Sequence, residues 1–101
     1  MDPERLSDLI IADVVMSTAG RDQGKLFYVI GTDPVYLILA NGKDRTLEKP
    51  KRKNIRHIQK VLRSETRVAE KLKLGDKVLN SELRRDLAYF SRDMQENNLG
   101  G

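Results

Sequence analysis

A run of basic side chains is the feature of this sequence with the clearest chemical consequence. Between Lys43 and Arg63 the chain carries nine lysines and arginines and two acids, a local net charge of +7, whereas the whole chain carries +4. The positive charge is therefore a patch. Clustered like charges repel one another unless an anion neutralises them, and nucleic acid is the commonest polyanion that a small protein meets. The residues of this run that we expect to contact RNA are Arg45, Lys49, Lys51, Arg52, Lys53, Asn54 and Arg56. A solvated, disordered charge cluster is the alternative interpretation.

A second group of candidate residues lies in the glycine-bearing segment AGRDQGK, residues 19–25. Gly24 allows a sharp turn and a close approach of the backbone to a partner, because no Cβ intervenes. Arg21 and Lys25 flank this turn and can reach phosphates. Asp22 cannot bind phosphate, so we expect its carboxylate to accept hydrogen bonds from loop amides. A plain hairpin turn without any contact to a partner is the alternative.

Composition and spacing argue against several other functions. The chain has no cysteine and one histidine, His57, so neither a disulfide framework nor a zinc site is expected. It contains no nucleophile–base set, no Walker loop and no carboxylate pair in a credible cleft, so we expect no catalysis, no cofactor and no small-molecule substrate. The acidic start MDPERLSDL differs from a signal peptide, and no apolar run approaches the ~20 residues of a membrane span. These features predict a cytoplasmic protein without a membrane partner.

The elements that must position these residues are strands in the first half of the chain. Apolar and β-branched residues predict strands over 9–17, 26–31 and 35–40, separated by glycine- and proline-containing turns. Asn41-Gly42 predicts a tight hairpin turn with a return strand over 45–48, ended by Pro50, and 54–58 is a candidate fifth strand. Short strands with tight turns leave no room for crossover helices, so the sheet must be antiparallel, and it buries its core best as a small barrel.

The second half of the chain changes to helical periodicity. We expect a helix over 64–74, with Ser64 as its N-cap and Gly75 as its C-cap. We expect Asn80 or Ser81 to cap a second helix. Its apolar stripe of Leu83, Leu87, Phe90 and Met94 either packs on the rest of the protein or docks a protein partner. Asp86 and Asp93 are expected to be solvated. The predicted organisation is a barrel with a basic tail over 1–62 and a helical hairpin over 63–101 with frayed last residues.

The segment from Asp13 to Ile58 resembles a KOW module. The strand VVMS, the loop AGRDQGK and the strand LFYVIG carry this resemblance. The following string VYLILANGKDRTLEKPKRKNIRHI is similar to its counterpart in KOW-containing large-subunit ribosomal proteins of the archaeal and eukaryotic type and in their short bacterial relatives. The resemblance implies an SH3-like β-barrel that binds RNA, often ribosomal RNA, and implies no catalysis. Family members use the loop between the first two strands and the basic tail after the barrel. The resemblance places Gly20, Arg21, Asp22, Gly24 and Lys25 in the loop, and Lys49, Lys51, Arg52, Lys53 and Asn54 in the tail.

Two functional hypotheses follow from these observations. The first is electrostatic binding of RNA, with ribosomal RNA or the ribosome as the expected partner and shape rather than base sequence as the basis of recognition. The second is a protein-interaction module of the transcription or translation machinery, in which the basic tail only accelerates encounter. Duplex DNA binding is disfavoured, because no helix carries a clustered basic face suited to the major groove.

Overall fold

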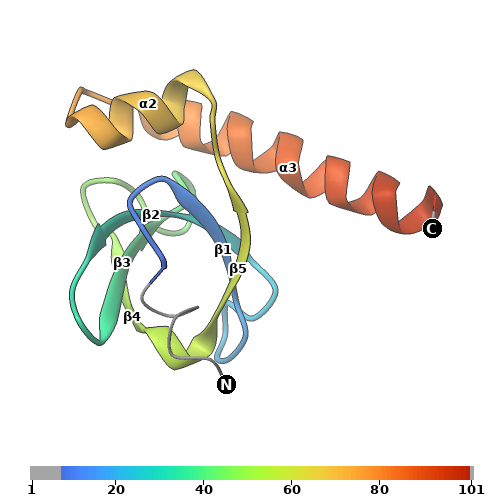
Figure 1. The fold of residues 1–101 in the computed structure, drawn as a ribbon, viewed down its shortest axis with the longest axis horizontal. Helices are drawn as coiled ribbons and strands as arrows, with labels where there is room; N and C mark the ends of the chain where they lie inside the picture. The colour runs from blue at the N-terminus through green and yellow to red at the C-terminus, as the bar shows by residue number, and fades with distance from the viewer. Residues whose placement is uncertain (1–7, 101) are drawn as a thin grey trace.

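The computed structural model describes residues 8–100, with the side chains of 8–95 (Figure 1). An antiparallel sheet is followed by two helices. The strands are β1 (Asp13–Ser17), β2 (Leu26–Thr32), β3 (Tyr36–Ala40), β4 (Lys51–Asn54) and β5 (Ile58–Arg63). The 3₁₀ turn η1 (Ile55–His57) links the last two strands, and the helices are α2 (Arg67–Leu74) and α3 (Asn80–Gly100).

The sheet is strongly bent but open. Its strand order is β4-β3-β2-β1-β5, so β4 and β5 are the edges of the described sheet. Pairing registers shift between Val14 and Val15 and between Val29 and Gly31. Such bulges bend a strand and increase its twist. The expected antiparallel sheet and two following helices are therefore present, whereas the hydrogen-bonded strands do not close into a full circle.

Each face of the bent sheet covers a separate apolar cluster, because successive side chains of a strand point to opposite faces. The inner cluster consists of Leu9, Val15, Phe27, Val29, Leu37, Leu39 and Ile58. The outer cluster lies under the helices and consists of Val14, Tyr28, Ala40, Val68, Leu83, Leu87 and Phe90. The predicted stripe of α3 is thus buried at three positions, which confirms that it packs on the protein. Met94 is half-buried.

The sequence prediction was wrong about how β3 continues. The return strand is β4, and its Lys53 and Lys51 pair with Leu37 and Leu39. The expected strand over 45–48 is an irregular loop, because Asn41 Oδ1 accepts from the backbone N–H groups of Lys43 and Arg45 and so widens the turn. The basic tail is consequently an edge strand within the sheet. The candidate strand over 54–58 is instead mostly η1.

The helices are joined to the sheet by a buried polar network that corrects two further expectations. Tyr28 Oη donates to Asp86 Oδ2 at 2.7 Å and lies 2.9 Å from Ser64 Oγ. Burial raises the pKa of Tyr28 to about 12, so the hydroxyl keeps its proton at neutral pH. Asp86 is therefore a structural acceptor and not a solvated acid. Thr66, not Ser64, caps α2 by accepting from Ala69 N.

The ends of the helices agree with local sequence chemistry. Gly75 adopts a left-handed conformation with φ of +75° and closes α2, as expected. Glu82 accepts from Leu79 N at 3.0 Å and so satisfies one of the unpaired amides at the start of α3. The second half of α3 extends beyond the sheet (Figure 1). Fraying was predicted for residues 97–101, whereas α3 continues through Gly100; Gly101 lies outside the described part of the chain.

Candidate nucleic-acid interface

The loop between β1 and β2 is held in place by a buried carboxylate. Asp22 accepts from Ser17 Oγ at 2.7 Å and from Lys53 Nζ at 2.8 Å. Its second oxygen, Oδ2, lies 2.5 Å from Lys51 Nζ. Lys53 Nζ also donates to the carbonyl of Ala19 at 2.6 Å. The loop is therefore joined to strand β4 through two lysines, and the sequence prediction that Asp22 accepts from loop amides was wrong.

The charge state of Asp22 follows from these contacts. Burial alone would raise its pKa, but the hydrogen bonds from Lys51, Lys53 and Ser17 outweigh burial and hold the pKa well below its usual value. The carboxylate is consequently ionised at neutral pH. Its single negative charge offsets one of the two positive charges of Lys51 and Lys53, so this part of the basic run is less positive than its sequence indicates.

The pleat of β4 divides the basic run between two faces of the sheet. Lys51 and Lys53 point toward Asp22, and Arg52 points to the opposite face because it lies between them. The guanidinium carbon of Arg52 lies 4.1 Å from the ring centroid of Tyr36, and its nearest carboxylate is Asp33 at 4.0 Å. The Arg52 side chain remains 64 % exposed, so its charge is accessible to a partner.

Four predicted site residues surround one hollow beside this network. The hollow has a volume of about 220 Å³ and is lined by Arg21, Asp22, Lys25, Phe27, Asp44, Arg45 and Lys51. We call it the cationic hollow, because its wall carries four cations and two carboxylates. Lys25 is paired with Asp44 at 2.7 Å, and both side chains are nearly half exposed. The structure thus brings together the loop, the turn after β3 and the start of β4.

The other predicted site residues are distributed around this region. Lys49 and Arg56 are exposed, and Gly24 is exposed with a φ of +88°. Asn54 accepts from Arg56 N at 2.9 Å and so caps η1. Among the predicted site residues, four exposed cations form no ion pair with a carboxylate of the described part of the chain; they are Arg21, Arg45, Lys49 and Arg56.

The C-terminal end of the basic run is neutralised internally. Arg63 Nε donates to Asp13 Oδ1 at 2.9 Å, and the Asp13 side chain is fully buried. Lys60 lies 3.1 Å from Asp8 and 3.9 Å from Asp13. Asp8 and Asp13 lie about 50 residues before Lys60 and Arg63, so sequence proximity gives no sign of these pairs. Fewer cations are therefore available to a partner than the basic run contains in the sequence, because Lys60 and Arg63 are paired with acids.

Two residues of α3 that were not predicted as part of the site fix the turn after β3. Asn80 Oδ1 accepts from Leu47 N at 2.8 Å, and Asn80 Nδ2 donates to Glu48 at 2.8 Å. Arg84 Nη1 donates to the carbonyl of Gly42 at 2.6 Å. The only signal in the sequence was the suitability of Asn80 for a helix start. These contacts hold the turn that carries Lys43, Arg45 and Lys49.

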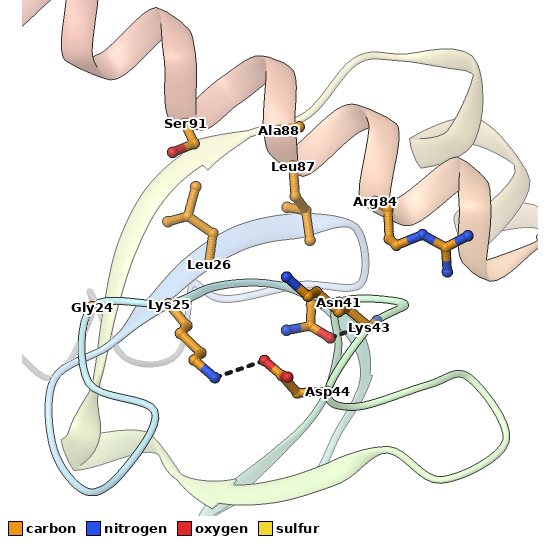
Figure 2. A pocket seen from close by; sticks show the side chains of 10 residues that line it. All are labelled: Gly24, Lys25, Leu26, Asn41, Lys43, Asp44, Arg84, Leu87, Ala88 and Ser91. Carbon is orange, nitrogen blue, oxygen red and sulfur yellow. Dashed lines mark hydrogen bonds and ion pairs between the residues drawn. The ribbon is translucent and has the colours of Figure 1, made fainter.

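A second hollow lies between α3 and the same turn (Figure 2). Its volume is about 520 Å³. Leu26, Leu87 and Ala88 form an apolar wall, and Lys25 and Lys43 lie on the polar side together with Asp44. We call it the helix-side hollow. Lys25 and Asp44 line both hollows, so the two are adjacent.

Neither a metal-binding cluster nor a membrane-spanning helix is found in residues 8–100. No group of three or more histidine, cysteine, aspartate or glutamate side chains is placed there to bind a metal ion. Over the same residues, neither helix combines the length and the apolar character needed to cross a membrane. Comparison with known proteins yields no family model that matches the chain and no curated protein of significantly similar sequence.

Proposed function

We propose that the protein binds RNA in the cytoplasm as a KOW-type module with an SH3-like fold, and that ribosomal or another translation-associated RNA is its partner. The observation that carries this proposal is the convergence of Arg21, Arg45 and Lys51 on one hollow from three separate segments. The bent sheet, with β5 against β1 and a bulge in that pairing, supports the fold assignment.

The proposed mechanism is electrostatic and involves no chemical step. Five exposed cations are placed to neutralise phosphates; they are Arg21, Arg45, Lys49, Arg52 and Arg56. Arginine forms two parallel hydrogen bonds with a phosphate, which suits a role in docking a backbone. Lys51 and Lys53 hold the loop in place through Asp22, so their main role is to position Arg21. The sequence instead predicted that Lys51 and Lys53 contact RNA directly, like Arg52.

Salt dependence of binding to ribosomal RNA fragments tests the proposal. Neutralising about five phosphates should give a slope of log K against log salt of about −3.5 to −4.5. Replacing Arg21, Arg45 and Lys49 with alanine should flatten the slope by about 2 to 3 units. The matched control replaces Arg67, Lys73 and Lys77, three exposed cations on or beside α2, and should leave the slope unchanged. An equal effect of both triple variants would show that only net charge matters, and the site would be rejected.

The apolar stripe of α3, which the sequence offered as a docking face for a protein partner, is largely buried. Leu83, Leu87 and Phe90 are at most 9 % exposed, so the predicted stripe offers a protein partner little contact area. RNA binding is therefore the function that the exposed side chains support best.

A further inference from the structure

The helix-side hollow has the chemistry of a binding site for one nucleotide. Its apolar wall comes from the start of β2 and from α3, where Leu26 and Leu87 lie side by side (Figure 2). Its charged lining consists of three basic side chains, Lys25, Lys43 and Arg84, and a single carboxylate, Asp44. A planar base with an attached phosphate matches this combination, because its faces are apolar and its backbone is anionic.

The dimensions and the position of the hollow agree with this occupant. Its volume of about 520 Å³ lies within the range of small-molecule sites, about 300–1,000 Å³. It adjoins the cationic hollow through the shared pair Lys25–Asp44, so a strand whose phosphates contact Arg21 and Arg45 can place a neighbouring nucleotide against α3. Asn41 and Ser91 add an amide and a hydroxyl that can hydrogen-bond to the edge of a base.

We propose that this hollow receives a single unpaired nucleotide of the bound RNA, with the base against Leu26 and Leu87 and its phosphate near Lys25 and Lys43. The inference rests on the proposed RNA-binding function and adds a structural preference to it. A base within a duplex must first be unpaired and unstacked, which costs a few kcal/mol, whereas a bulged base is already unpaired. The protein should therefore favour RNA helices that contain a bulge.

The test compares two RNA hairpins that differ by one bulged nucleotide, with binding measured by fluorescence anisotropy. The full chain should bind the bulged hairpin about tenfold more tightly than the fully paired one. Ala88→Phe places a ring in the hollow from an exposed helix position and should abolish this preference while affinity for the paired hairpin stays the same. Gln59→Phe adds the same ring at an exposed position of β5 outside the hollow and should retain the preference.

The outcomes separate this inference from the proposed function. Equal binding of both hairpins by the wild-type protein would overturn the nucleotide site and leave RNA binding intact. A preference that persists in Ala88→Phe would also overturn it, because the base would then bind elsewhere. Failure to bind either hairpin at low salt would reject the proposed function together with the site.

Discussion

The ammonium group of Lys53 lies 2.8 Å from the carboxylate of Asp22, and the two side chains are only 9 % and 11 % exposed. This pair joins the glycine-bearing loop to the edge strand of the sheet. Because Lys51 lies on the second oxygen of the same carboxylate, one acid holds two members of the basic run. The basic run therefore contains both the candidate RNA contacts and part of the framework that positions them.

Asp22→Asn should destabilise the protein. The substitution leaves the Lys53 ammonium buried without its counterion, and removal of one partner from a buried ion pair costs about 3 kcal/mol or more. We expect a loss of about 3 kcal/mol in the free energy of unfolding, measured by urea denaturation. Lys53→Met should cost less, because Asp22 keeps Lys51 as its partner and the methionine side chain fills similar space. A milder effect of Asp22→Asn than of Lys53→Met would contradict this account.

The stability of the wild-type protein should fall in acid because of the same carboxylate. The pKa of Asp22 is lower in the folded protein than its ordinary value of 3.8. Its contribution is therefore complete above this value and is lost as the pH falls below it toward the folded-state pKa, since the unfolded chain binds the proton first. The free energy of unfolding should drop more steeply below about pH 4 in the wild type than in Asp22→Asn. Parallel curves for the two proteins would show that other carboxylates dominate acid unfolding.

The sequence predicted three of the five strands, β1, β2 and β3, because each is marked by its own apolar and β-branched residues. Apolar, β-branched segments bounded by glycine gave β2 and β3 nearly to the residue. It failed at β4 because Lys51–Asn54 carries no apolar residue, and the strand exists through its pairing with β3. The chain does turn at Asn41-Gly42, and Gly42 has the predicted positive φ, +77°. The turn is wider than the predicted hairpin because Asn41 Oδ1 accepts from Lys43 N.

Composition predicted which residues form the candidate site. It did not predict that Lys51 and Lys53 pair with Asp22 while Arg52 points to the opposite face. A charge count identifies Lys51, Arg52 and Lys53 as one cluster, whereas the alternation of strand β4 separates Arg52 from its neighbours. Nor can local sequence show that Asp22 lies against Lys53, because the pair joins positions 31 residues apart. An acid in the predicted loop and lysines at alternate positions could have suggested such a pair, had the basic segment been recognised as a strand.

Asp44→Asn should strengthen RNA binding. Asp44 is a carboxylate that lines both hollows, and its Oδ2 forms an ion pair with Lys25 Nζ at 2.7 Å. Removing its charge leaves Lys25 available to a phosphate and removes a repulsive group from the rim. We expect about threefold tighter binding at low salt and a smaller gain at high salt, because exposed charges are screened. Weaker binding by Asp44→Asn would mean that this ion pair positions Lys25 rather than competing for it.

Asn80→Ala should weaken RNA binding without removing any cation. Asn80 anchors the turn at Leu47 and Glu48, and the neighbouring loop residues Arg45 and Lys49 are proposed phosphate contacts. Without this anchor the loop must be ordered on binding, and each immobilised side chain costs about 0.5–1.5 kcal/mol. Affinity should fall about threefold or more, and amide hydrogen exchange at Leu47 should accelerate. Faster exchange with unchanged affinity would show that the loop does not contact RNA. Ser81→Ala, an exposed neighbour in the same helical turn, is the matched control and should change neither quantity.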